Sequence, residues 1–467
     1  MRIIQTFWSG GRDPLQYGYG WRHAEHNLMS WALSCCSLRE HYDQVELYTD
    51  QRGYDVLIEK LHLPYTAVHV VYDDHLCLPQ HWAYAKIKTY SMQTEPFLHV
   101  DGDVYISKPF PEEVHNAPLV VQNEEIGTAY YRSMLDSILK IPNVWLPDYV
   151  HAVLDGQLLP SYNMGVFGGN DLKFIHDYCK EATSFIFRNE LNNTANPHSH
   201  VDCNVFFEQM LFAIISKKHG RELSKVIPCA VKDNGYTHSD FCDLYNYREK
   251  GFFHLLGGHK RVQQTFHNVA DILLTHFPKF YDHVLDIIDT LTSVYFHCST
   301  FSYEKQLDDI KNRWRTLGRE ILLEQEKQYA SSIFSLISKK WENLCLALPQ
   351  YYSLISVEKE SLEEKNYLLK NFKLERNFPL KRIALTPSLI YPWTNEFPLL
   401  DEDEKIISLI QRKHAPISIR ELQEISIYEH NCRNDTSVKR IRTYVMNEVS
   451  YMVKARILIL QQENSNR

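Results

Sequence analysis

Short apolar runs alternate with stretches of helical periodicity over the first 125 residues. Apolar residues dominate 2–7, 45–48, 67–71 and 97–100, and each run has the length of a buried strand. Strands that alternate with helices through short loops predict an α/β fold, a Rossmann-like mixed sheet with helices on both faces. The helices that the intervening apolar spacing predicts are 28–36, 55–61 and 86–92.

The remainder of the chain has a different pattern. Residues 125–290 are mixed, whereas 300–375 are charged and have helical spacing. Prolines cluster over 378–398, which marks a boundary, and 400–467 contain three helix-like segments before a closing apolar run. We therefore expect an α/β domain over 1–290, a helical linker region over 291–377, and a small helical or winged-helix-like module over 378–467.

Composition narrows the class of protein. The chain has 467 residues, 44% hydrophobic and 23% charged, which is an ordinary globular balance. Its net charge of −8 offers no overall attraction to nucleic acid, so a nucleic-acid partner is disfavoured. The start of the chain lacks the apolar core of a signal peptide, and no run approaches the roughly 20 apolar residues of a membrane span. With ten scattered cysteines and no CxxC pair, we expect a cytoplasmic protein with reduced thiols and no transmembrane segment.

Two aspartates follow the apolar run at 97–100 directly, in the sequence Asp101-Gly102-Asp103. Ligands gather at the carboxyl ends of strands in such sheets, and two carboxylates on a tight turn can reach one divalent cation. A cation held there would bridge a diphosphate and neutralise charge on a leaving group. An Asp-x-Asp alone is common in solvated loops, and the preceding strand is what favours a metal site.

A second motif, H-x-x-G-x-x-K, is formed by His254, Gly257 and Lys260. Histidine can supply a third cation ligand, glycine lets the backbone approach phosphates, and lysine pairs with phosphate charge. In isolation the same fragment is more often a turn with a packed histidine and a surface lysine.

Together the two motifs resemble those of the retaining glycosyltransferases of the GT-A fold, the glycogenin and lipopolysaccharide galactosyltransferase group. The resemblance covers about the first 270 residues. It implies a GT-A type sheet and transfer of a sugar from a nucleotide donor, foremost a UDP-sugar, to a sugar, glycan, lipid or peptide acceptor. It also implies Mn²⁺ or Mg²⁺ held by Asp101, Asp103 and His254, with Gly257 and Lys260 on the diphosphate.

Two further segments fit this resemblance. Residues 162–167 resemble the family's F-N-x-G-V segment, whose asparagine lies near the transferred sugar, and a strand with a glycine bend is the plainer interpretation. Residues 207–211 resemble its acid-Gln segment, which implies Glu208 and Gln209 as catalytic residues, with Asp202 as a competitor. Glu208 stands where aspartate is commoner, and as a plain alternative it is a helix-surface carboxylate. The other expected donor-binding residues are Phe7, Trp8, Asp50, Lys86, Asp101, Gly102, Asn163 and Gly165.

The chain departs from that group at its start, where Gln5-Thr6-Phe7-Trp8 replaces an Asn-Tyr-type donor pocket. The N-terminal pattern also resembles a bacterial family with no assigned function. Two other functions stay open: a nucleotide-sugar- or glycan-binding protein with a decayed transferase site, and a sugar nucleotidyltransferase. A sugar nucleotidyltransferase normally has a glycine-rich basic loop near its N-terminus, and residues 9–12 resemble such a loop only weakly.

The C-terminal module raises a separate question. A winged helix could bind DNA, but this one begins with the acidic run at 401–404. We expect it either to dock a protein or peptide or to cover an edge of the first domain.

Overall fold

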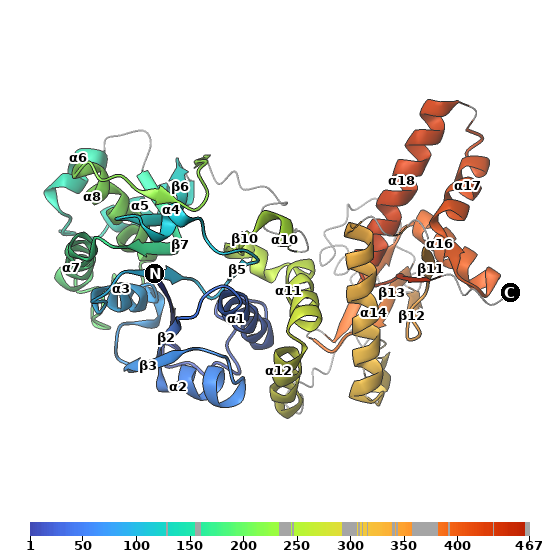
Figure 1. The fold of residues 1–467 in the computed structure, drawn as a ribbon, viewed down its shortest axis with the longest axis horizontal. Helices are drawn as coiled ribbons and strands as arrows, with labels where there is room; N and C mark the ends of the chain where they lie inside the picture. Colours follow the sequence, from blue (N-terminus) through green and yellow to red (C-terminus); the bar gives the residue numbers. More distant parts are fainter. Residues whose placement is uncertain are drawn as a thin grey trace. The chain divides into compact units, whose positions relative to one another are not determined.

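The computed structural model describes most of the chain and divides it into two compact units, Met1–Val269 and Ala270–Arg467 (Figure 1). No described helix has both the length and the apolar character needed to cross a membrane. Much of the 300–375 segment, and residues 378–381 of the proline cluster, lie outside the described part. The described residues are 1–127, 129–154, 160–232, 244, 247–291, 306, 309–310, 312–314, 316–338, 341, 344–356, 382–390, 393–432 and 434–462.

The first unit is built on a mixed sheet of eight strands in the order β3-β2-β1-β4-β7-β6-β8, with β9 also paired to β6. Strands β3, β2, β1 and β4 are parallel, whereas β7 runs antiparallel to both β4 and β6. The α/β class and the mixed sheet are therefore confirmed. The strands are β1 Arg2–Phe7, β2 Val45–Asp50, β3 Ala67–Tyr72, β4 Phe97–Val100, β6 Val120–Ile126, β7 Pro160–Gly169, β8 Ser224–Lys225 and β9 Val231–Lys232.

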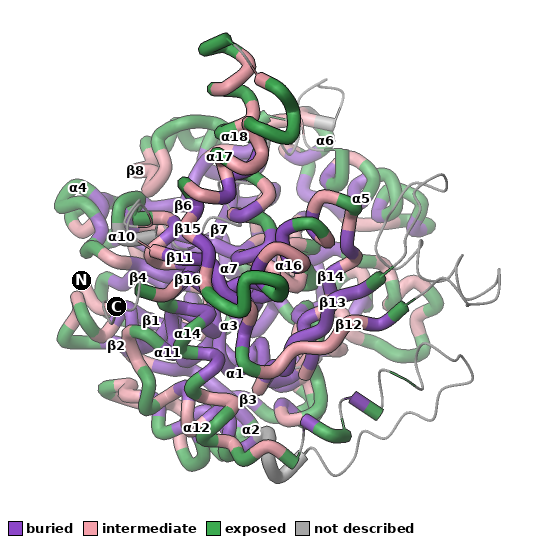
Figure 2. Tube along the Cα trace, turned by 90° about the vertical axis from the view of Figure 1, so that its right-hand side faces the viewer, coloured by how far each residue is buried: buried purple, intermediate pink, exposed green. Residues whose placement is uncertain are grey.

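Side chains that alternate along the strands fill a core on each face of this sheet. Ile4 and Phe97 belong to one buried cluster, while their neighbours Ile3 and Leu98 belong to another. Strand β4 is buried along its whole length (Figure 2). Helices α3, α7 and α8 contribute to the first cluster and α1 to the second, so both faces are covered as expected. These helices are α1 Ala24–Arg39, α3 Tyr84–Ser91, α7 Leu172–Arg188 and α8 Leu211–Lys218.

Shorter helices connect these layers. The helix expected over 55–61 begins earlier, with α2 at Gln51, because the Asp50 carboxylate accepts the backbone N–H of Gly53 and caps the first turn. A π-helical turn then covers Asp55–Lys60. The other described helices of the first unit are η2 Pro79–His81, α4 Glu112–His115, α5 Ala129–Leu139, α6 Asp148–Leu154, η3 Phe206–Met210, α10 Tyr247–Lys250 and η5 Gly257–Arg261. Helix α11, Gln263–His276, spans the boundary at residue 269, and α12, Pro278–Leu291, belongs to the second unit.

The second unit contains three helices followed by a strand near its end, as the sequence predicted: α16 Asp401–Lys413, α17 Ile419–Glu429, α18 Asp435–Lys454 and β16 Ile459–Gln462. It also contains two small sheets, β15-β11-β16 and β12-β13-β14, which the helical expectation missed. Strand β11 pairs with strands far away in sequence, so local spacing could not reveal it. The other elements are α14 Arg319–Ile337, β11 Leu344–Ala347, β12 Ser353–Ser356, β13 Arg382–Pro387, β14 Thr394–Leu399 and β15 Ile417–Ser418.

Asp403 makes the stability of the second unit depend on pH. It is buried in the first turn of α16 and accepts the backbone N–H of Leu400. Burial, with a smaller contribution from the neighbouring Glu448, raises the pKa of Asp403 to about 7 against the opposing effect of the Leu400 amide. Because this folded pKa exceeds the value of 3.8 for a free side chain, stability is lost as pH rises through that interval.

Asp403→Asn keeps the cap acceptor and removes the buried charge. We expect it to raise the free energy of unfolding by about 1 kcal/mol at pH 8, with a gain that shrinks toward pH 5. Chemical denaturation at the two pH values measures this. An equal gain at both would show that the carboxyl does not titrate as described.

Candidate metal centre and donor site

Strand pairing brings His254 next to the two aspartates. Asp101 follows β4 directly, and the chain turns through Gly102 and Asp103 into β5, Val104–Ile106. Strand β10, Phe252–His254, pairs antiparallel with β5 and places His254 opposite Val104. The backbone N–H of Leu255 also donates to the Asp103 carbonyl over 3.0 Å. Residues about 150 positions apart in the chain thus meet at the carboxyl end of β4.

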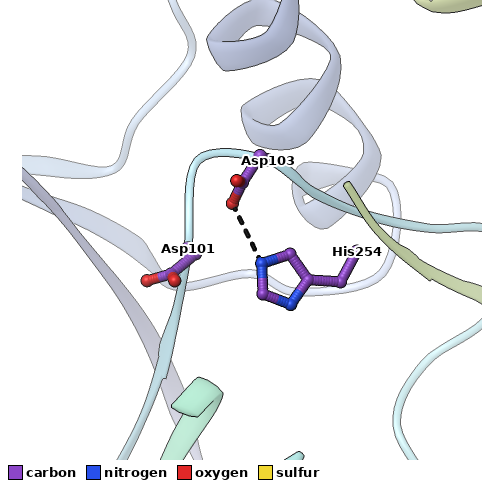
Figure 3. Close-up of side chains that lie close together, drawn as sticks. All are labelled: Asp101, Asp103 and His254. Carbon is purple, nitrogen blue, oxygen red and sulfur yellow. Dashed lines mark ion pairs between the residues drawn. The ribbon is translucent and has the colours of Figure 1, made fainter. Parts of the chain in front are cut away.

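Asp101, Asp103 and His254 converge on one point (Figure 3). Each offers one ligand atom, and these atoms lie within 4.8 Å of one another. His254 Nε2 lies 3.4 Å from Asp103 Oδ1. Two carboxylates and one imidazole form a donor set that suits Mn²⁺ or Mg²⁺, with positions left over for phosphate oxygens or water.

Gln122 fixes the orientation of the histidine. His254 Nδ1 lies 2.7 Å from Gln122 Oε1, and both side chains are buried. An amide oxygen can only accept, so Nδ1 carries a proton, and Nε2 is the nitrogen that faces the Asp103 carboxylate and that a cation at this point would bind. Metal-bound histidines have this arrangement, with the second ring nitrogen held by a protein acceptor. The residues therefore fit a metal ion. Sequence reasoning missed Gln122, because only the fold places β6 behind His254.

Gly165 leaves the space that the His254 ring occupies. A Cβ at this position would overlap the His254 imidazole and the Gln122 amide. The Gly165 carbonyl also accepts the backbone N–H of Asp101 over 2.9 Å. Gly102 is restricted in the same way, because a Cβ there would overlap the Trp31 indole. Two of the three glycines expected at the donor site, Gly102 and Gly165, are thus required by packing against neighbouring side chains.

Gly165→Ala should displace His254 from the carboxylates. We expect Mn²⁺ binding to weaken by at least about tenfold, the lower end of the effect of losing a residue that orients a ligand. Isothermal titration measures it, with Gly318→Ala as control because a Cβ there meets nothing within 4 Å. Unchanged Mn²⁺ affinity would remove His254 from the ligand set.

Lys86 joins Asp101 to Glu208. Its Nζ lies 2.8 Å from the Asp101 carboxylate and 2.8 Å from Glu208 Oε1. Burial works against the charged form, but Asp101 and Glu208 together raise the pKa of Lys86 above its ordinary value. Glu208 is buried, so the helix-surface alternative for this residue is wrong. Glu208 and Asp101 therefore share Lys86 as their ion-pair partner.

The pKa values of the two aspartates are shifted in opposite directions. Burial raises the pKa of Asp101 even though Lys86 acts against it. For Asp103, burial is outweighed by Lys260 and His254, which hold its pKa well below the ordinary value. Lys260 Nζ contacts Asp103 Oδ2 directly. Asp103 is therefore the more strongly ionised carboxylate of the pair.

Asn163 and Gln209 belong to a neighbouring polar network. Asn163 Oδ1 accepts the Gly165 N–H over 3.0 Å, and its amide nitrogen donates to Glu125 over 3.2 Å. The Tyr131 hydroxyl contacts Glu125 and lies 2.9 Å from Gln209 Oε1. The two residues are thus linked through Glu125 and Tyr131, neither of which the sequence motifs indicated.

Phe7 and Trp8, expected at the nucleotide base, are buried. Phe7 packs edge-on against Tyr19 and Trp31, with ring centroids 5.2 and 5.3 Å away. Trp8 donates its indole N–H to the Asp73 carbonyl over 2.9 Å. These contacts fit the core-packing alternative; a contact with a base stays a prediction.

The last three candidates have different surroundings. Asp50 accepts the backbone N–H groups of Ser9 and Gly53 over 2.7 and 2.8 Å, so its carboxylate stabilises the backbone at the end of β2. Asp202 is exposed and accepts the Tyr130 hydroxyl over 2.6 Å. Gly257 has φ +48 and open space at its Cβ position, which leaves its backbone approachable.

Comparison with known proteins gives a family and weak matches to solved structures. No curated protein matches the chain. One solved structure that matches is the apo form of mouse xyloside xylosyltransferase 1, at 12% identity and a TM-score of 0.28, covering 48% of this chain and 84% of that one. Residues 1–287 match the family described as a family of unknown function, DUF6734. Because the match spans more than half of the chain, the chain belongs to this family.

Proposed function

We propose that this protein is a metal-dependent glycosyltransferase that moves a sugar from a nucleotide-sugar donor, foremost a UDP-sugar, to a glycan, lipid or peptide acceptor. The observation that carries the proposal is the convergence of Asp101, Asp103 and His254 at the carboxyl end of β4. Lys86 contacts Asp101 and Lys260 contacts Asp103, so positive charge suited to an anionic diphosphate lies beside the three ligands.

Asp101, Asp103 and His254 would hold the ion, which would supply electrostatic stabilisation of the departing diphosphate. The charge of Asp103 anchors it, and Gln122 presents His254 in the required tautomer. Lys260 is close enough to pair with a phosphate oxygen on the same ion, since it already contacts Asp103. Preorganised charges of this kind contribute most where charge develops during the reaction.

Glu208 is the residue that we assign to the reacting sugar. Lys86 holds its carboxylate in place and opposes the rise in its pKa that burial causes. A fixed carboxylate can stabilise the positive charge that develops on the sugar carbon as the diphosphate leaves. Gln209 is the alternative, and its amide is oriented by Tyr131. Retention of the anomeric configuration is proposed on the motif resemblance.

The test is metal-dependent hydrolysis of nucleotide sugars by the purified full-length protein. A panel of UDP-sugars with Mn²⁺ or Mg²⁺ should show release of UDP from at least one donor. EDTA should stop the release, and excess Mn²⁺ should restore it. Binding of UDP-sugars without any turnover would instead favour a carbohydrate- or nucleotide-binding protein with a decayed site. If the protein neither binds nor turns over any donor in the panel, the proposal is contradicted.

A further inference from the structure

Lys260 forms an ion pair with Asp103, one of the three proposed metal ligands. Its ammonium group contacts Asp103 Oδ2, while His254 Nε2 faces the other oxygen of the same carboxylate. In the described structure Asp103 is therefore already neutralised by a side chain of the protein.

A divalent cation at this point would lie close to the ammonium group. Like charges at contact distance repel strongly in a partly buried site, where water screens them poorly. If Lys260 kept its contact with Asp103, it would therefore weaken cation binding. The lysine can relieve the repulsion only by moving to a different anionic partner.

Lys260 is the more exposed of the two site lysines. Its side chain is 19% exposed, whereas that of Lys86 is 10% exposed and lies between two carboxylates. It lies on the short η5 helix, which begins at Gly257 with φ +48 and open space around it. A flexible four-carbon chain at the solvent edge can exchange partners without a change in the sheet.

We propose that Lys260 is an exchangeable counter-ion. It covers Asp103 when the site holds no ligand, and it moves to a diphosphate oxygen when cation and nucleotide bind. The diphosphate gives Lys260 a new anionic partner, which frees the Asp103 carboxylate for the cation. Binding of the diphosphate therefore strengthens binding of the cation, and the reverse. The inference rests on the proposed function, which supplies the diphosphate.

The test is the Mn²⁺ affinity of the full chain, measured by electron paramagnetic resonance with and without saturating UDP. Lys260→Met should bind Mn²⁺ alone at least about tenfold more tightly than the unmodified protein. UDP should tighten Mn²⁺ binding by at least about tenfold in the unmodified protein and by much less in the variant. Lys88→Met is the control, because Lys88 is exposed on α3. Lys260→Gln, which keeps a hydrogen-bond donor without the charge, provides a second variant if Lys260→Met does not fold.

The outcomes separate this inference from the proposed function. Unchanged or weaker binding of Mn²⁺ alone in both Lys260 variants would overturn the counter-ion role, even if the protein hydrolyses a nucleotide sugar. Tighter binding of Mn²⁺ alone with no effect of UDP on any variant would support the counter-ion but overturn the exchange and the proposed donor. Tighter binding together with reduced coupling supports the exchange.

Discussion

Asp103→Ala should abolish metal-dependent turnover of a nucleotide sugar, with a loss of at least about a thousandfold, and leave the fold intact. Asp103 is the more strongly ionised of the two aspartates, since Lys260 and His254 keep its pKa low despite burial. Without it, only Asp101 and His254 would face the cation. The fold should survive because Lys260 is at the solvent edge and can turn outward once its partner is lost.

Release of UDP from the best donor measures the activity, and thermal unfolding checks the fold. Asp177→Ala is a suitable control, because Asp177 forms only exposed helix-surface ion pairs with Lys173 and Lys180. The control should retain full activity. Turnover by Asp103→Ala at the rate of the unmodified protein would remove the metal assignment.

Lys86→Met should strongly lower the free energy of unfolding of the first unit. Lys86 lies 2.8 Å from the half-buried carboxylate of Asp101 and 2.8 Å from the buried carboxylate of Glu208. Methionine keeps the length of the side chain but leaves the two acids facing each other without a counter-charge. Removing one partner of a buried ion pair typically costs about 3–5 kcal/mol.

The loss should be greater at pH 8 than at pH 5. Burial already raises the pKa values of both acids, and without Lys86 they should rise further. A carboxyl whose folded pKa exceeds its unfolded value loses stability as pH rises through that interval, so protonation at pH 5 relieves part of the penalty. Denaturant unfolding at the two pH values measures this, with exposed Lys88→Met as control. A loss below about 0.5 kcal/mol would contradict the ion-pair geometry.

Local sequence was sufficient for the parts of the fold that depend on near neighbours. The apolar runs predicted β1, β2 and β4, which are largely buried and therefore rich in hydrophobic residues. The run at 67–71 predicted β3 as well, although this end strand is mostly half-buried or exposed. The Asp-x-Asp turn was found because it follows such a run directly. His254 was found only through its spacing to Gly257 and Lys260, and its meeting with the aspartates depends on the pairing of β10 with β5.

Other features depend on contacts between distant segments. Gln122 acquires its role only when β6 lies beside His254, and nothing in its own neighbourhood indicates this. Gly165 was expected near the donor from the segment 162–167, but that segment did not indicate its packing against the His254 ring. Glu208 carried a usable signal. It is flanked by Phe206, Phe207, Met210 and Leu211, so a charged residue there should have suggested a buried, paired carboxylate. Strand β11 was missed because its partners come about 70 and 115 residues later.

The central claim is that Asp101, Asp103 and His254 hold one divalent ion that also contacts a diphosphate. Anomalous diffraction at the manganese edge, from crystals grown with Mn²⁺ and UDP, tests it most directly. We expect one strong peak about 2.2 Å from a carboxylate oxygen of each aspartate and from His254 Nε2, with UDP phosphate oxygens completing the coordination. Ordered UDP with no peak at these three side chains, or a peak bound elsewhere while His254 stays on Asp103, would contradict the account.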